Sequence, residues 1–388
     1  MIADRLAQHL TPGSRVALGD GAGVPRGLAD ALPEAAQAAG GVSLLLGWCL
    51  EQPLPLPSPA LDDVRAIMGG YGVRRAIRDG DVRYLPVRYG DLPSLLGARM
   101  RPDVLLAGLV PVPGGLGFAT EIGWQEAVVR AGTPVLAEVN HALPRAAAGA
   151  PLPVDQVIVI DEVERPPIAR PAPEPSATSR EIARRVAELI PAGAALEVAP
   201  GELGDAVLAA LERPVQLQTG ALGDGAVALD ARGLLLGEPC ASYVVGGEEL
   251  YRWADGRPIV AGIDETHDAA RLHRHAAFFA VNGAFEVDEV GNVNAQGLGD
   301  DVSAGIGGVH DFAAAATRAA HGLSIIALPS DRGGRGTLVK RLSAPPTLTR
   351  SIVDVVVTEQ GVADLRGLSD RERAAALHAV YEGALTSA

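Results

Sequence analysis

The sequence is short of cysteine, aromatic residues and lysine, and each shortage argues against a class of function. Its 388 residues include two cysteines, Cys49 and Cys240. Two are too few for a disulfide framework, so we expect buried thiols in a reducing compartment. Aromatic residues make up 4% of the chain and are not interleaved with basic ones, which argues against a stacking surface for single-stranded nucleic acid. Lys340 is the single lysine, so neither Schiff-base chemistry nor a P-loop lysine is expected.

Long apolar runs and excess positive charge are also missing. No apolar run reaches the ~18 residues that a membrane helix needs, so no membrane span is expected. The segment MIADRLAQHL lacks the basic start and apolar core of a secretory signal. A formal net charge of -14 argues against a nucleic-acid surface, because neutralising phosphates requires a basic patch. These features predict a cytoplasmic protein that binds neither nucleic acid nor membrane.

The chain is long enough for two domains, each with its own core. Residues 164–180, ERPPIARPAPEPSATSR, are rich in proline and read as a linker. Before them, apolar runs such as RVALGDG and DVLLAGLVPV alternate with amphipathic segments such as GLADALPEAAQAAG. This alternation is typical of a mostly parallel sheet covered by helices. We therefore predict two α/β domains, residues 1–170 and 171–388.

The second half restarts like the first. Without gaps, Leu10, Pro12 and Leu32 align with Leu189, Pro191 and Leu211, and the expected strand, loop and helix coincide. This weak repeat predicts two similar domains. In a doubly wound sheet, ligands bind beyond the carboxyl ends of the strands. The loops after Leu18 and Val198 are therefore expected to lie on the ligand side.

The most informative segment is residues 279–312, FAVNGAFEVDEVGNVNAQGLGDDVSAGIGGVHDF. It predicts two strands and a glycine knot, Gly305-Ile306-Gly307-Gly308, followed by a helix. Glycines let backbone amides approach a ligand closely, and a helix N-terminus favours phosphate or an oxyanion. The alternative is a tight turn that binds no ligand.

The motifs of this segment and those after it resemble the acetyl-CoA hydrolase/transferase family, a branch of the class I CoA-transferases. The matching stretches are EVD at 286–288, GNVN at 291–294, the glycine knot, IIALPS at 325–330 and VVTEQGVADLRG at 356–367. The resemblance implies two α/β domains with an active-site cleft between them. It also implies that CoA or an acyl-CoA such as acetyl-CoA is a substrate rather than a permanent cofactor, and that a small carboxylate is the partner. Members of the family are commonly homo-oligomers.

One position departs from the family pattern. The family's HTExxxDG stretch carries a glutamate that attacks the thioester and then holds CoA as a glutamyl thioester. In VQLQTGALGDG, Thr219, Asp224 and Gly225 match, but Gly220 stands where the glutamate should be. Glycine has no side chain to form that intermediate. Three hypotheses remain: Glu202 replaces the nucleophile, water attacks with Glu202 or Asp224 as base, or the protein binds a thioester without turning it over.

The resemblance also implies a set of CoA contacts. These are the loop Ala199, Pro200, Gly201, Glu202 and Leu203, the knot residues Ala304, Gly305, Gly307 and Gly308, and Arg332 of the PSDRGGRG turn. A guanidinium at position 332 is suited to CoA phosphates. The alternatives are an ordinary strand-to-helix connection, a helix cap at Glu202 and a solvated surface arginine.

Two further sequence patterns, a group of histidines and a glycine-containing loop, do not indicate a function. His267, His273 and His275 do not share one helical face, so we expect solvated side chains and no metal site. The loop GDGAGVP, Gly19 to Pro25, lacks the last glycine of a dinucleotide fingerprint. No acidic ribose partner follows at the usual spacing, so a nicotinamide-dependent oxidoreductase is disfavoured.

Overall fold

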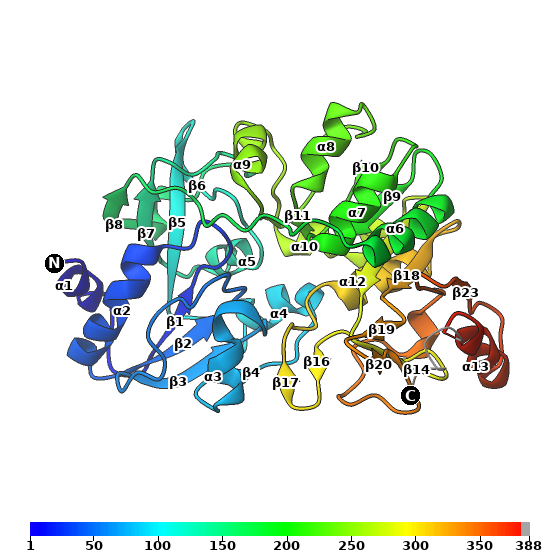
Figure 1. The fold of residues 1–388 in the computed structure, drawn as a ribbon. Coiled ribbons are helices and arrows are strands. Elements are labelled where there is room, and N and C mark those ends of the chain that lie inside the picture. Colours follow the sequence, from blue (N-terminus) through cyan, green and yellow to red (C-terminus); the bar gives the residue numbers. More distant parts are fainter. Residues whose placement is uncertain (382–388) are drawn as a thin grey trace. The chain divides into compact units, whose positions relative to one another are not determined.

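The computed structural model describes residues 1–381 and divides the chain into two compact units (Figure 1). The first unit contains Met1–Arg170, Ser242–Glu265 and Asp301–Gly305, and the second contains Pro171–Ala241, Thr266–Asp300 and the chain from Ile306 onward. The predicted domain boundaries, 1–170 and 171–388, stay a prediction. In the structure, the segments Ser242–Glu265 and Asp301–Gly305, which follow residue 170, belong to the first unit.

Specific contacts explain why these later segments belong to the first unit. The Tyr243 hydroxyl donates to Asp20 Oδ2 at 3.1 Å, and Asp301 accepts from Arg74 Nε at 3.0 Å. These partners are far apart in sequence, so local patterns do not indicate the pairing.

The first unit is built on a sheet in the strand order β4-β3-β2-β1-β5-β7-β8, in which neighbouring strands run parallel. Its strands are β1 (Ser14–Leu18), β2 (Val42–Leu46), β3 (Leu61–Ala66), β4 (Arg83–Tyr84), β5 (Val104–Val112), β7 (Val135–Asn140) and β8 (Val157–Val163), with β6 (Gly115–Gly117) antiparallel to β5. Its helices are α1 (Ile2–Ala7), α2 (Arg26–Ala39), α3 (Arg74–Arg78), α4 (Leu92–Gly97), α5 (Gln125–Arg130) and α9 (Glu248–Ala254). Short elements are η1 (Tyr71–Val73), η2 (Tyr89–Asp91), η3 (Val154–Gln156), β12 (Tyr243–Val244) and β17 (Asp301–Val302).

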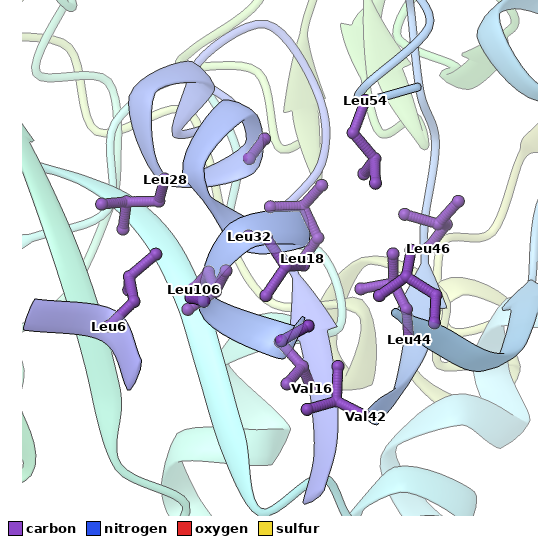
Figure 2. Packing of buried hydrophobic residues seen from close by; sticks show 14 of the residues in the cluster. Leu6, Val16, Leu18, Leu28, Leu32, Val42, Leu44, Leu46, Leu54 and Leu106 are labelled. Carbon is purple, nitrogen blue, oxygen red and sulfur yellow. The ribbon is translucent and has the colours of Figure 1, made fainter. Parts of the chain in front are cut away.

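The core of this unit follows from the apolar pattern. On α2, Leu28, Leu32 and Ala36 recur every four residues and are buried, as a helix that covers a sheet requires. Figure 2 shows Leu28 and Leu32 beside Leu18 of β1 and Leu106 of β5. Burying each leucine contributes about 1.5–3 kcal/mol, so this cluster fixes the helix on the sheet.

The second unit has a sheet in the order β10-β9-β13-β18-β22-β23, parallel except for the β22–β23 pair. These strands are β10 (Gln216–Leu217), β9 (Ala195–Val198), β13 (Phe278–Gly283), β18 (Leu323–Ala327), β22 (Val355–Val357) and β23 (Val362–Asp364). A smaller sheet joins β15 (Val293–Asn294), β14 (Glu286–Asp288) and β21 (Leu338–Val339), and a hairpin pairs β19 (Asp331–Arg332) with β20 (Arg335–Gly336).

The second unit contains several helices, some of which pack against its sheet. They are α6 (Ala177–Leu189), α7 (Glu202–Ala210), α8 (Gly225–Ala231), α11 (Ala269–Leu272), α12 (Val309–Ala316) and α13 (Asp370–Ala379), with η4 (Arg350–Ile352). The short strands β11 (Ala221–Leu222) and β16 (Gly297–Leu298) also lie here, and α10 (Ile263–Thr266) crosses the unit boundary along the chain. The helix-to-sheet contacts include those of α12 with β13 and β18, of α6 with β18 and β22, and of α13 with β23.

Both units open alike, with helix, strand and helix in the order α1-β1-α2 and α6-β9-α7. The gapless alignment places β1 over β9, as the weak sequence repeat predicts. The predicted fold class, α/β with mostly parallel sheets, is confirmed. Among the helices of residues 1–381, none has the length and apolarity needed to cross a membrane.

Candidate functional site

The second unit has a cavity of about 670 Å³ beyond the carboxyl ends of β13 and β18. Its lining residues include Ser179 of α6, Glu202 and Leu203 of α7, Phe285 after β13, and Arg332 of β19. Parallel strands end at one edge of a sheet, where the loops that follow them diverge and leave a crevice. Three predicted CoA contacts, Glu202, Leu203 and Arg332, therefore line one cavity. Residues 199–201 form the loop that directly precedes α7.

Glu202 begins α7 and binds the start of α6. Its Oε1 accepts from the backbone N–H of Ser176 at 2.9 Å and from the Ser179 hydroxyl at 2.7 Å. Ser176 is also the N-cap of α6, accepting from Ser179 N–H at 3.1 Å. The bond from the Ser176 backbone, followed by that from Ser179, lowers the pKa of Glu202. A carboxylate so held is a weak base, so this geometry favours a capping role over catalysis. The helix end that Glu202 caps is the start of α6, not that of its own helix α7, whose N-cap is Gly201.

Arg332 is placed to meet an anion. Its Nη2 donates to the Ala284 carbonyl at 3.3 Å, and its guanidinium carbon lies 5.2 Å from the centre of the Phe285 ring. Its neighbour Arg335 instead donates to Glu286 Oε1 at 2.7 Å. Arg332 lines the cavity and is exposed, so it is the better candidate for a phosphate contact.

The EVD motif around Glu286 has a structural role: its carboxylate holds neighbouring segments together. The buried Glu286 carboxylate accepts from Asn294 Nδ2 at 3.1 Å, and from the backbone and hydroxyl of Ser343 at 2.8 and 2.7 Å. Burial raises the pKa of Glu286, but these donors and Arg335 outweigh that effect, and its pKa lies below the ordinary value. The motif fixes β14 to β15 and to the segment around Ser343.

Gly220 lies between β10 and α8, near the end of β9. The preceding Thr219 hydroxyl donates to the Val198 carbonyl at 2.9 Å, which holds this loop to the sheet. An ideal Cβ at Gly220 would lie 3.2 Å from His267 Nε2 and 3.3 Å from Phe312 Cε2. Asp224, the other base considered, is the N-cap residue of α8.

Each glycine of the knot has a local structural cause. A Cβ at Gly305 would overlap Met68 Sδ, to which the Gly305 amide donates at 3.1 Å. Gly307 has φ +55°, and a Cβ at Gly308 would overlap the His267 ring. Ala304 and Gly305 belong to the first unit, and Gly307 and Gly308 to the second. None of the four is among the residues lining the 670 Å³ cavity, so the knot's CoA contact stays a prediction.

The expectation of solvated histidines is wrong for His267. Its side chain is buried, with 3% of the residue exposed, and burial lowers its pKa to about 3. His273 is exposed and His275 half-buried. Periodicity alone missed His267 because its burial depends on the distant Gly220 and Phe312. Within residues 1–381, no cluster of three or more His, Cys, Asp or Glu side chains is arranged to hold a metal.

The glycine loop of the first unit is occupied by a carboxylate of the protein itself. The Gly23 amide donates to Glu121 Oε2 at 3.0 Å, and the Thr120 hydroxyl donates to the same atom at 2.6 Å. A Cβ at Gly21 would lie 2.6 Å from that oxygen. The loop therefore lies against Glu121, and this arrangement disfavours a dinucleotide phosphate there.

Sequence reasoning also missed Glu197 on β9. This buried carboxyl accepts from Asn282 Nδ2 at 2.8 Å, and burial raises its pKa to about 8. One feature of the sequence could have identified Glu197: it is an acidic residue within the apolar strand ALEV. Charged side chains are rarely buried in such strands, so an acid there indicates an unusual environment.

The comparisons with known proteins agree with this fold. RipA from Yersinia pestis has a TM-score of 0.87 at 22% identity, covering 99% of this chain and 96% of that one. The 4-hydroxybutyrate CoA-transferase from Porphyromonas gingivalis has a TM-score of 0.77 at 23% identity, covering 98% and 92%. At these identities the likeness shows the fold alone: the chain has the fold of a CoA-transferase.

Sequence comparison points to the family that the motifs resemble. Residues 246–383 match the acetyl-CoA hydrolase/transferase C-terminal domain. The 4-hydroxybutyrate coenzyme A transferase of Clostridium kluyveri is 28% identical over 80% of this chain and 77% of its own length. The butyryl-CoA:acetate CoA-transferase of Anaerostipes caccae is 28% identical over 80% and 76%. The resemblance is confirmed: residues 246–383 match the family model, and over about 80% of its length the chain is similar to CoA-transferases.

Replacing Glu202 tests its capping role. We expect Glu202→Ala to lower the free energy of unfolding by about 1–3 kcal/mol, the usual cost of losing hydrogen bonds to a charged group. Chemical denaturation provides the measurement, and Glu212→Ala is the control, because Glu212 is exposed just after the same helix. Equal stability of the two variants would contradict the capping role.

The buried acid Glu197 predicts a pH dependence. Its folded pKa of about 8 exceeds the ordinary value of 4.5, so the folded state binds the proton more tightly than the unfolded state. The resulting stability is fully present below pH 4.5 and is lost as pH rises towards 8, at about 1.4 kcal/mol per pKa unit. Glu197→Gln removes this titration, so the variant should gain stability relative to the parent between pH 5 and pH 8.

Denaturant unfolding at several pH values checks this effect, with the exposed Glu212→Gln as control. The assignment fails if the stability curves of Glu197→Gln and the parent protein run parallel over this range.

Proposed function

We propose that the protein binds an acyl-CoA in the cavity beside Glu202 and Arg332 and transfers CoA to a small carboxylate without an enzyme-bound glutamyl thioester. Acetyl-CoA or a similar short thioester is the expected donor. The observation that carries the proposal is the convergence of predicted CoA contacts at the carboxyl edge of the sheet, in a chain whose relatives are named as CoA-transferases.

The absent glutamate determines the form of the reaction. With no side chain at Gly220, an oxygen of the acceptor carboxylate attacks the thioester carbonyl, the C–S bond breaks and CoA leaves as the thiolate. The thiolate then attacks the acceptor carbonyl of the mixed anhydride, and the donor acid leaves as a carboxylate. Both substrates must be bound at once, because no covalent enzyme intermediate stores CoA between them.

Hydrolysis belongs to the same proposal, with water as the acceptor in place of the carboxylate. It requires a base, and Glu202 is poorly suited because its hydrogen bonds from Ser176 and Ser179 lower its pKa. We therefore expect transfer to exceed hydrolysis. No permanently bound cofactor, a cytoplasmic location and a homo-oligomeric assembly complete the proposal.

A second candidate is a binding or sensing protein that does not turn the thioester over. Two observations favour it: position 220 has no nucleophile, and His267 and Phe312 lie at the place of the missing side chain. The two candidates share the ligand and differ in whether the thioester is consumed.

Initial rates with acetyl-CoA and a carboxylate acceptor test the transfer mechanism. We expect double-reciprocal lines that intersect, as for a ternary complex, and no covalent CoA on the protein by mass spectrometry. Parallel lines together with CoA on a glutamate would overturn direct transfer. Tight calorimetric binding without loss of thioester would select the binding protein instead.

Replacing Arg332 tests the cavity itself. Arg332→Gln should weaken calorimetric binding of CoA roughly tenfold or more, because a charge-assisted hydrogen bond is worth about 1.5–3 kcal/mol. Arg371→Gln is the control, since Arg371 is exposed on α13 and outside the cavity lining. If Arg332→Gln binds CoA as the parent does, CoA does not use this cavity.

A further inference from the structure

A buried histidine lies against the position of the missing nucleophile. The ring of His267 approaches Gly220, Gly308 and Phe312, with its centre 4.7 Å from that of Phe312 at an interplanar angle of 47°. Its Nδ1 lies 2.8 Å from the hydroxyl oxygen of the adjacent Thr266. These residues belong to the second unit, so the contacts follow from its own packing.

We propose that His267 fills the space into which a side chain at position 220 would extend, and so prevents a nucleophile from being restored there by a single substitution. The inference rests on the proposed function only where it concerns thioester chemistry. His267 acts here as a positioning residue: it determines which backbone and side-chain arrangement the 220 loop can adopt.

The contact distances support this assignment. A Cβ at Gly220 would lie 3.2 Å from Nε2 and 3.5 Å from Cε1 of His267, and 3.3 Å from Phe312 Cε2. The contacts to Nε2 and to Phe312 Cε2 are tighter than ordinary van der Waals separations, so the two rings must move by a few tenths of an ångström even for a methyl group. A glutamate adds further atoms beyond that Cβ.

The His267 ring also explains why position 308 of the knot is a glycine. A Cβ at Gly308 would overlap Cδ2 and Nε2 of His267, so the ring requires glycine at 308 as well as favouring it at 220. His267 is therefore held between two glycines and an aromatic ring. Burial keeps the imidazole neutral, which allows it to pack there without the cost of a buried charge.

This packing prevents the formation of a glutamyl-CoA thioester at position 220. A glutamate oxygen at position 220 would attack the thioester carbonyl, releasing the CoA thiolate and forming a mixed anhydride. The thiolate would then attack the glutamyl carbonyl, releasing the acyl group as a carboxylate and leaving CoA covalently on the protein. Removing the imidazole should give that glutamate room to act.

A stability cycle tests the packing without any ligand. Gly220→Ala should lower the denaturation midpoint in the parent protein, and the shift should be at least halved in the His267→Ala background. Gly336→Ala is the control, because no atom lies closer than 3.9 Å to its added Cβ, and its shift should be equal in both backgrounds. Equal shifts for Gly220→Ala in the two backgrounds would overturn the proposal.

Mass spectrometry after incubation with acetyl-CoA tests the chemical consequence. The double variant Gly220→Glu/His267→Ala should carry covalent CoA, and Gly220→Glu alone should carry little or none. Equal adduct on both, or adduct on neither although both bind acetyl-CoA, would mean that His267 is not the barrier. If neither variant nor the parent binds acetyl-CoA, the proposed function fails, and the stability cycle alone decides the role of His267.

Discussion

The parallel pairing of β9, β13 and β18 is the constraint on which the candidate site depends. Because these strands are paired in one direction, they end at the same edge, at Val198, Gly283 and Ala327. The loops that follow carry Glu202 and Arg332 to one cavity. Both β13 and β18 are buried along nearly their whole length, so the packing of their apolar residues also fixes where the polar groups meet.

Around that edge, the carboxyl groups of three glutamates have different pKa values, because burial and donated hydrogen bonds act on them to different extents. Glu202 and Glu286 each accept several bonds, including backbone N–H groups, and their pKa values fall below the ordinary range. Glu197 is buried among strands, and its raised pKa favours the protonated form. The balance between burial, which raises the pKa, and donated hydrogen bonds, which lower it, therefore determines the charge of each carboxyl group. The charged acids brace loops, whereas the neutral one lies within the sheet.

Local patterns were enough to predict the α/β class, the restart after the linker and the family motifs. The departure from the family pattern at Gly220 stays a prediction from the sequence, made because Thr219 and Asp224-Gly225 leave little freedom in the alignment. The assignment of Ser242–Glu265 to the first unit was not predictable, since it depends on contacts such as Tyr243 with Asp20. His267 was misjudged for the same reason: helical spacing describes one element, while its burial comes from the loop at Gly220 and the helix at Phe312.

The packing around Gly220, where the resemblance places the family's glutamate, bears on the proposed reaction. If the loss of its carboxylate had simply left a polar gap beside the Gly308 backbone, that space would attract water, because buried water occupies polar sites with several hydrogen-bonding partners. Water near a thioester favours hydrolysis. The neutral His267 ring and the Phe312 edge instead contact the positions from which a side chain would extend, and so they leave less room for water. Under the proposed function, this packing favours binding, or direct transfer to a carboxylate that brings its own nucleophilic oxygen, over hydrolysis by a water at position 220.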